Sequence, residues 1–397
     1  MRKIGFVIPW YGEHEPDGIE AELRELVARL QKAGTEVEVL TTCIQGFRSD
    51  WNRNYYAAGT SLVNNILVRR FPTYRRDTTA FEQVVRKMNA GQHLSLSEEQ
   101  TYIEENINSP QLYEYLLTAE EEYALYVFLP YAFGTTYSGI QIALEKSVMI
   151  PCFQDEASLS MRLFRQEYVH TKAMIYHTAT EMELAGRVYD FSTTEQICIG
   201  AGVETEIQAD ATIFRKAFQI HQPYLLYVGR KDASKNLPLL LRYFAELKHR
   251  HPDSPLQLVL IGEGNTKIPV SIQDDVYDLG YVTEQDKYHA MAAALALCQP
   301  SGQERFAPVL MESWLCGRPV LVSAKYAVTK DFARRTNGGL YFRNYFEFEG
   351  SIQYLLEHPD EANQMGENGR DYVRTHFNWQ RIINRYQTFF QKISGEE

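Results

Sequence analysis

Two cationic side chains occupy a short segment with the pattern of a strand-to-helix turn. Arg230 and Lys235 follow an apolar run that ends at Gly229, and a helical pattern begins near Asn236. A guanidinium fork and an ammonium group suit a diphosphate by charge and by geometry. On this segment alone, a solvated surface loop is an equally good interpretation.

Two carboxylates stand in a second segment, about seventy residues further on. Glu304 follows an apolar run, and Glu312 comes after Pro308, which is suited to open a helix because its missing N–H is not needed there. The amides of such a first turn would meet an anion. They belong to residues near Ala307, Val309 and Leu310. The carboxylates would accept hydrogen bonds from sugar hydroxyls. The alternative is charge complementarity at the helix N-terminus for Glu312 and a solvated Glu304.

The elements that must position these residues alternate between strand and helix. An apolar run at 3–9, a helical pattern at 19–32 and an extended run at 37–40 predict a βαβ unit with a parallel sheet. After residues 204–222, interpreted as a linker, the alternation restarts. The further predicted strands are 125–129, 148–153, 174–177, 196–199, 224–228, 256–261, 295–299 and 319–323; the further predicted helices are 81–88, 98–117, 237–250, 285–294, 308–316 and 361–390.

This pattern predicts an α/β chain with two Rossmann-like domains. We expect an N-terminal domain at 1–205, a C-terminal domain at 206–370 and a C-terminal helix at 371–397. In doubly wound folds, ligands bind beyond the carboxyl ends of the strands. Gly262 and Glu263 follow a strand of the second domain, so they are expected on the same rim as Arg230 and Lys235.

Composition narrows the class of protein. The net charge of −11 disfavours general nucleic-acid binding, which needs a basic face, but permits an anionic ligand held by a few local cations. The five cysteines form no C-x-x-C pair, and no stretch of about 18 apolar residues occurs. We expect a cytoplasmic protein, with peripheral attachment to the inner face of the plasma membrane as an alternative.

Several common motifs are missing. Neither G-x-G pair, at 200–202 or 262–264, continues into G-x-G-x-x-G, which disfavours a pyridine-nucleotide dehydrogenase. No G-K dipeptide forms a P-loop, and no D-x-D pair offers a metal site. We therefore expect neither a metal nor a resident cofactor.

The pair of segments V-G-R-x4-K-N and E-x7-E, at this separation, resembles the retaining glycosyltransferases of family 4, which have the GT-B fold. Within that family it resembles transferases that build cell-envelope or heterocyst-envelope polysaccharides. Shorter similarities occur at 17–20, 199–203, 278–282, 317–320 and 338–340. The resemblance implies two domains facing each other across a cleft, with the C-terminal helix crossing back onto the first domain.

The resemblance also implies a role for each matching position. Arg230 and Lys235 would hold the donor diphosphate, Glu304 would orient the donor sugar, and Glu312 would accept the ribose hydroxyls. Gly18 would let the first loop approach the phosphates. The remaining donor-binding positions would be Gly229, Gly262, Glu263, Tyr281, Val282, Phe306, Ala307, Pro308 and Val309.

Two departures from the family pattern concern the acceptor side. Gln154-Asp155-Glu156 stands where the family often has His-Asp, and Asp17 replaces the first glycine of G-G. We expect Asp155 near the reacting sugar; the alternative is an N-cap for a helix at 157–165.

The predicted reaction is the retaining, metal-independent transfer of a hexose, with UDP-glucose as the expected donor. The acceptor would be a polysaccharide or a lipid-linked saccharide. Arg69, Arg70, Arg75 and Arg76, interleaved with aromatic residues, could touch an anionic membrane, although a solvated loop is the simpler interpretation. The alternatives are a non-catalytic glycosyltransferase-like subunit and a sugar-nucleotide epimerase of the same fold.

Overall fold

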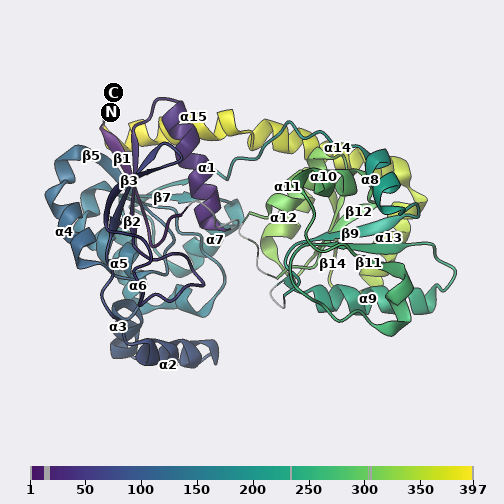
Figure 1. Cartoon of the computed structure of the whole chain (residues 1–397), viewed down its shortest axis with the longest axis horizontal. Helices are drawn as coiled ribbons and strands as arrows, with labels where there is room; N and C mark the ends of the chain where they lie inside the picture. The colour runs from purple at the N-terminus through teal and green to yellow at the C-terminus, as the bar shows by residue number, and fades with distance from the viewer. Residues whose placement is uncertain (1, 13–17, 233–234, 303, 305, 396–397) are drawn as a thin grey trace. The chain divides into compact units, whose positions relative to one another are not determined.

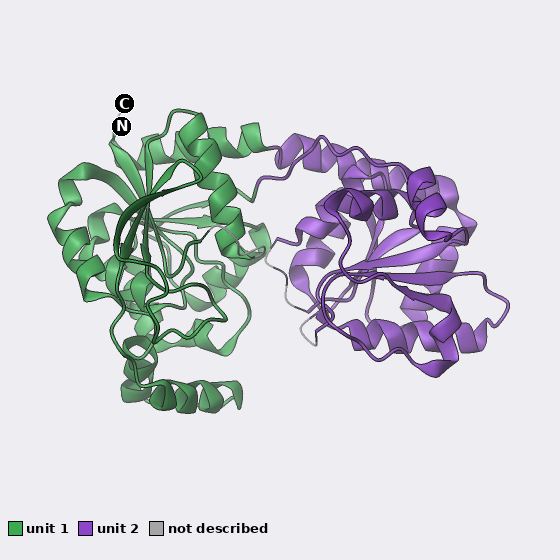
Figure 2. Cartoon of the chain, in the orientation of Figure 1, with its two compact units in different colours: residues 1–201, 379–397 green, residues 202–378 purple. Residues whose placement is uncertain are grey.

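The chain folds into two compact α/β units (Figures 1 and 2). The computed structural model describes residues 2–12, 18–232, 235–302, 304 and 306–395. Residues 1–201 and 379–397 form the first unit, and residues 202–378 form the second. These divisions fall at 201/202 and 378/379, whereas the expected boundaries are 205/206 and 370/371.

The first unit is built on an eight-stranded sheet. Its strand order is β3-β4-β2-β1-β5-β6-β7-β8, and each pair is parallel except β3 with β4. The order reverses between β1 and β5, which places a topological switch point there. The strands are β1 (Lys3–Ile8), β2 (Val37–Thr42), β3 (Gly59–Val63), β4 (Ile66–Phe71), β5 (Tyr123–Phe128), β6 (Ser147–Met149), β7 (Ala173–Tyr176) and β8 (Glu195–Cys198).

Helices cover both faces of this sheet (Figure 1). They are α1 (Ile19–Lys32), α2 (Thr78–Asn89), α3 (Leu96–Glu104), α4 (Pro110–Thr118), α5 (Gly134–Ile142), α6 (Arg162–Glu167), α7 (Ala179–Val188) and α15 (Trp379–Ser394). The βαβ unit predicted at the N-terminus is confirmed, and α1 has the predicted bounds.

Two predictions for the first unit are wrong in detail, and one pair of strands was missed. The single helix expected at 98–117 is two helices, because Ser109 caps a new helix at the Leu112 amide and Pro110 opens it. The strand expected at 148–153 ends at Met149, since Pro151 follows and Cys152 has a left-handed φ of 57°. The antiparallel pair β3 and β4 was not predicted.

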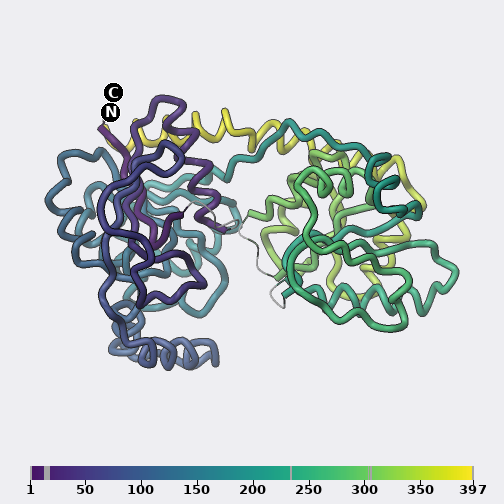
Figure 3. Tube along the Cα trace, in the orientation of Figure 1, coloured from purple at the N-terminus to yellow at the C-terminus, as the bar shows by residue number. Residues whose placement is uncertain are grey.

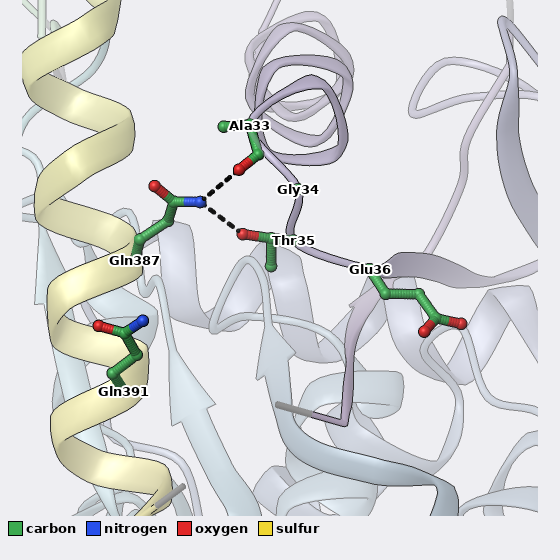
Figure 4. A pocket seen from close by; sticks show the side chains of 6 residues that line it. All are labelled: Ala33, Gly34, Thr35, Glu36, Gln387 and Gln391. Atoms are coloured by element: carbon green, nitrogen blue, oxygen red, sulfur yellow. Dashed lines mark hydrogen bonds between the residues drawn. The ribbon is translucent and has the colours of Figure 1, made fainter. Parts of the chain in front are cut away.

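The C-terminal helix α15 packs on the first unit, as the resemblance implies. Its apolar stripe is buried, and the Phe6 and Phe390 rings meet edge to face at 6.4 Å. Arg385 donates to the carbonyl oxygens of Ile199 and Cys198. Gln387 Nε2 donates to Ala33 O and Thr35 Oγ1, each at 3.0 Å, in a small polar pocket (Figure 4). The trace in Figure 3 leads both chain ends to this unit.

The helix expected at 361–390 is likewise two helices with different partners. α14 (Pro359–His376) belongs to the second unit and packs against α11, whereas α15 belongs to the first. Between them, Phe377 O accepts a hydrogen bond from Val203 N at 2.8 Å. The amphipathic pattern continues across this break, so periodicity alone does not reveal it.

The second unit has a six-stranded, wholly parallel sheet in the order β11-β10-β9-β12-β13-β14. Its strands are β9 (Tyr224–Val228), β10 (Gln257–Ile261), β11 (Val276–Asp278), β12 (Ala296–Gln299), β13 (Val320–Ser323) and β14 (Gly339–Phe342); its helices, besides α14, are α8 (Ala211–Phe218), α9 (Leu237–Arg250), α10 (Glu284–Ala293), α11 (Pro308–Leu315), α12 (Ala327–Thr336) and α13 (Tyr345–Glu357). The expected linker at 204–222 therefore contains a helix. Its Phe214 is buried against Tyr224 at 5.6 Å between ring centroids.

The strand order of the second sheet reverses between β9 and β12. β9 leads through α9 to β10 on one side, and β12 leads through α11 to β13 on the other. Because such crossovers are right-handed, α9 and α11 cover opposite faces of the sheet, as Figure 1 shows. Both helices begin at the edge where β9 and β12 end, which is where doubly wound sheets bind ligands.

Candidate functional site

The loop after β9 carries the first predicted motif and is fixed by its backbone. Tyr227 Oη donates to Arg230 O at 2.6 Å, and Lys231 N donates to Glu263 O at 2.8 Å. The second bond ties this loop to the loop that follows β10. Arg230 and Glu263 therefore lie on one rim of the sheet, as predicted.

Close backbone contact explains the glycine after β10. Gly262 has a φ of 133°, and a Cβ there would lie 2.1 Å from Gly229 O. Gly262 N also donates to Gly280 O at 2.8 Å, which brings the turn before Tyr281 and Val282 alongside. Tyr281 is 79% exposed. The predicted base-lining positions thus lie on neighbouring turns.

The two predicted motifs meet at an ion pair. Lys235 Nζ lies 2.6 Å from Glu304 Oε1, and these side chains are 20% and 11% exposed. Asn236 Nδ2 also donates to Pro300 O at 3.3 Å, joining the same two loops. Arg230 lies in the same loop as Lys235, and its Nε is 3.3 Å from Asp232 Oδ2.

The two helices at the switch point begin without side-chain caps. Asn236 precedes α9 and Ala307 precedes α11, both with left-handed backbone, and neither side chain caps its helix. Uncapped first turns leave backbone donors for an anion. One predicted amide is engaged, however, because Leu310 N donates to Ala307 O at 3.0 Å. The backbone amide of Val309 lies in the first turn of α11, directly after Pro308, where the anion site was predicted.

Glu312 lies on α11 and pairs with Lys287, a lysine that was not among the predicted site residues. Its Oε2 is 2.8 Å from Lys287 Nζ on α10, and its side chain is 17% exposed. Burial raises the pKa of the Glu312 carboxyl, and Lys287 opposes that rise. Phe306, by contrast, is buried against the rings of Phe332 and Phe377, so it acts as a packing residue in this loop.

A second lysine was also missed. Lys231 has a side chain only 1% exposed, and its Nζ lies 2.5 Å from Asp278 Oδ1 at the end of β11. The pair ties the Arg230 loop to the end of β11, two strands away in the sheet. Because Lys231 stands between Arg230 and Asp232 in a charged run, the sequence carries no signal that it alone is buried.

In the first unit, the loop after β1 leads toward Gly18. Gly18 has a φ of 84° and directly precedes α1. Before it, Gly12 N donates to Glu20 Oε1 at 2.6 Å, and Arg24 Nη1 donates to Gly12 O at 3.0 Å. Arg70 Nη2 donates to Tyr11 O at 2.9 Å. Asp17 lies outside the described residues.

Asp155 is exposed in the loop after β6. The helix that it was alternatively expected to cap does not start there: a 3₁₀ turn runs over Ala157–Ser160 without a side-chain cap, and α6 begins at Arg162. Asp155 and Gly18 belong to the first unit, whereas the predicted cations and acids of the donor site belong to the second.

The fold engages most of the basic segment 69–76. Arg69 pairs with Glu38 at 2.8 Å, Arg70 is buried, and the Arg76 guanidinium stacks on Trp51 at 4.7 Å from the ring centroid. Arg75 is exposed. The segment therefore does not present four unengaged cations at one surface.

The described residues offer neither a cluster of metal ligands nor a membrane-spanning helix. Outside the gaps at 13–17, 233–234, 303 and 305 and at the termini, no group of three or more His, Cys, Asp or Glu side chains could hold a metal ion. Within the same ranges, no helix has the length and apolar character needed to cross a membrane.

Comparisons with known proteins find a matching family model and several relatives. Residues 209–372 match the family model described as glycosyl transferases group 1. A D-inositol 3-phosphate glycosyltransferase of Corynebacterium aurimucosum is 23% identical over 249 residues, 58% of this chain and 59% of the relative. A trehalose synthase of Pyrococcus horikoshii is 24% identical over 189 residues, 44% of this chain and 45% of the relative. The matched region thus spans less than two thirds of these curated relatives.

Solved structures match the whole chain. Sucrose-phosphate synthase from Thermosynechococcus elongatus has a TM-score of 0.70 at 17% identity and covers 100% of both chains. Anabaena HepE, in complex with UDP and glucose, has a TM-score of 0.69 at 15% identity, covering 99% of this chain and 100% of that one. At these identities the likeness establishes the fold. Residues 209–372 therefore match the group 1 glycosyl transferases, and the chain as a whole shares the GT-B fold of these solved structures.

Proposed function

We propose that this chain is a retaining hexosyltransferase that uses a nucleoside diphosphate sugar and needs no metal ion. The observation that carries the proposal is the 2.6 Å pair between Lys235 Nζ and Glu304 Oε1 at the β9–β12 switch point. An ammonium group has three donors, so one bond to Glu304 leaves two for phosphate oxygens. Glu304 thereby orients the Lys235 ammonium group and leaves it able to donate to a phosphate.

In this proposal the second unit stabilises the leaving group. Negative charge grows on the diphosphate as the glycosidic bond breaks. Lys235, Arg230 and the uncapped first turns of α9 and α11 are fixed beforehand at one rim, so they favour that charge over the ground state. Their fixed backbone, held by Lys231 and Asp278, supports such preorganisation.

The acidic residues and the exposed turns would recognise the rest of the donor. The second oxygen of Glu304 would accept a sugar hydroxyl, and Glu312 would accept the ribose hydroxyls. Gly262, Glu263, Tyr281 and Val282 would line the base. Asp155 would lie near the reacting sugar from the first unit.

We take UDP-glucose as the donor. Anabaena HepE was solved with UDP-glucose and with UDP and glucose, and it shares this fold along the whole chain. The acceptor in this proposal is a saccharide or a lipid-linked saccharide. Membrane contact through the basic segment 69–76 has weaker support, because only Arg75 of its four arginines is exposed without a described partner in the fold.

The test is Lys235→Ala, assayed by release of UDP from UDP-glucose with and without a saccharide acceptor. Removing one preorganised donor costs about 3 kcal/mol, so turnover should fall on the order of a hundredfold while thermal stability changes little. Lys216→Ala is the matched control, because Lys216 is exposed on α8 of the same unit.

UDP binding, measured as a thermal shift, distinguishes an error in the proposed binding residues from an error in the proposed donor. UDP should raise the melting temperature of the wild-type protein and of Lys216→Ala, since a ligand of the native state stabilises it. The shift should shrink in Lys235→Ala. Full turnover in Lys235→Ala would contradict the proposed role of this site.

A further inference from the structure

A buried histidine in the first unit is flanked by two carboxylates. His177 follows β7, and its side chain is 2% exposed. Its Nε2 lies 2.5 Å from Glu22 Oε1 on α1, and its Nδ1 lies 3.7 Å from Glu181 Oε2 on α7. None of these three residues takes part in the donor site described above.

The positions of the two carboxylates favour a charged ring. A carboxylate only accepts hydrogen bonds, so Nε2 must carry a hydrogen to contact Glu22 at this distance. In a neutral ring Nδ1 would then turn a lone pair toward the Glu181 carboxylate. The Nδ1 atom is buried and has no hydrogen-bond partner among the described residues. An imidazolium, protonated on both nitrogens, is attracted to both carboxylates.

Among the described residues, four titratable groups from four elements lie near the ring. Glu22 approaches from α1, Glu181 from α7, Cys152 from the loop after β6 and Tyr386 from α15. Burial alone would lower the pKa of His177, but Glu22, Cys152 and Glu181 outweigh it and raise that pKa well above its ordinary value. The electrostatics therefore agree with the geometry.

Glu181 connects the histidine to the loop that carries Asp155. Its Oε1 accepts a hydrogen bond from Phe153 N, and its Oε2 accepts one from His177 N, each at 2.8 Å. Phe153 lies two residues before Asp155, and its ring packs on Tyr131 at 4.9 Å. The same carboxylate thus holds the ends of two neighbouring strands.

Glu22 connects the histidine to the loop after β1. It lies in the first turn of α1, four residues after Gly18. The ring of His177 therefore stands between the helix that follows the Gly18 loop and the residue that fixes the Asp155 loop. Both loops are at the carboxyl edge of the first sheet, where the resemblance implies that the first unit takes part in transfer.

We propose that His177 is a positioning residue whose imidazolium holds Glu22 and Glu181 together, and so fixes α1 relative to the Phe153–Asp155 loop. The consequence is a first unit whose part in transfer is lost at alkaline pH. The last step rests on the proposed function; the fixing of the two segments does not.

The protonation state is measured by NMR on the full chain with labelled histidine rings. Comparison of wild type with His177→Gln identifies the signals of His177. They should be those of an imidazolium at about pH 7, where an ordinary histidine is mostly neutral. In Glu22→Gln the ring should lose its proton at a lower pH. A neutral His177 ring at about pH 7 would refute the proposal.

Hydrogen exchange tests the fixing of the two segments. In His177→Gln the side chain can still donate one bond but carries no charge, so exchange should rise at the amides of Phe153 and His177 and in the first turns of α1. His93→Gln is the control, because His93 is exposed in the same unit. An equal increase in hydrogen exchange throughout the first unit would show that His177 stabilises the unit generally and does not specifically fix these two segments.

The pH profile of turnover tests the functional step. A raised pKa means that the interaction is complete below the ordinary histidine pKa of about 6.5 and is lost as pH rises through the folded-state value. Wild type and His93→Gln should share an alkaline fall in kcat that His177→Gln lacks. The KM for the donor should stay nearly constant, since its cations lie in the second unit. A chain that is inactive with every donor would contradict the proposed function. The NMR and exchange results would still test whether His177 holds Glu22 and Glu181 together.

Discussion

At the proposed donor site, opposing effects act on the pKa of single side chains, and Glu312 is the clearest case. Burial raises the pKa of its carboxyl, and Lys287 Nζ at 2.8 Å opposes that rise. A raised carboxyl pKa means that the protonated form is favoured in the fold. The stabilising effect is complete below the ordinary glutamate pKa of about 4.3 and is lost as pH rises through the folded-state value.

Donor binding should respond in the opposite direction. If the Glu312 carboxylate accepts ribose hydroxyls, the Kd for UDP should increase as pH falls through the raised pKa of this group. Titration calorimetry of UDP over a pH series measures the effect. Glu312→Gln should bind more weakly at neutral pH and lose this part of the pH dependence; parallel curves for the two proteins would contradict the assignment.

Residue types at this site were predictable, but their pairing was not. Arg230, Lys235, Glu304 and Glu312 stand out by charge and spacing, and the structure joins Lys235 to Glu304. Lys287, the partner of Glu312, comes from a helix whose charges look like those of any solvated face, and Lys231, which pairs with Asp278, stands in a charged run. Which lysine is buried depends on tertiary packing, and spacing along the chain does not encode it.

At the scale of elements, the proposed donor site depends on close contact between the turns at Gly229 and Gly262. A Cβ on Gly262 would lie 2.1 Å from Gly229 O, at a φ of 133° that other residues rarely adopt. Gly262→Ala should therefore separate the loops after β9 and β10, destabilise the protein by about 1–3 kcal/mol and weaken UDP binding. Denaturant unfolding and calorimetry would measure the two effects.

Gly350→Ala is the matched control for that substitution. Gly350 lies within α13 of the same unit, and no atom lies within 4 Å of a Cβ placed there. Alanine is the better helix former by roughly 1 kcal/mol, so this variant should be slightly more stable and bind UDP normally. Equal changes in stability and UDP binding in Gly262→Ala and Gly350→Ala would contradict the importance of the contact between Gly262 and Gly229.

Elements with a strong period were predicted well, and breaks between elements were not. The bounds of α1, β9 and α9 agree with the apolar pattern, because each buries one face or both. The breaks at Ser109 and Phe377 escaped notice since apolar residues continue across them. β3 escaped because four of its five residues are exposed and carry no buried pattern.

At the scale of the whole molecule, the first unit is discontinuous in sequence. α15 supplies Phe390, which is fully buried against Phe6 of β1. Phe390→Ala should cost about 3–5 kcal/mol of unfolding free energy. Lys392→Ala, on the same helix, removes an exposed pair with Glu195 and should cost at most about 1 kcal/mol. Denaturant unfolding compares the two.

The location of the loss can be checked as well. Phe390→Ala should weaken protection from hydrogen exchange in β1 and β5, which lie under α15, while the strands of the second unit keep theirs. A loss confined to the second unit would contradict the assignment of α15 to the first.

The discontinuity also has a consequence for biosynthesis. The ribosome must complete the whole of residues 202–378 before α15 exists, so the surface that receives Phe389 and Phe390 stays uncovered throughout that interval. A nascent chain halted within the second unit would present this apolar surface to chaperones, because the helix that covers it has not yet been made.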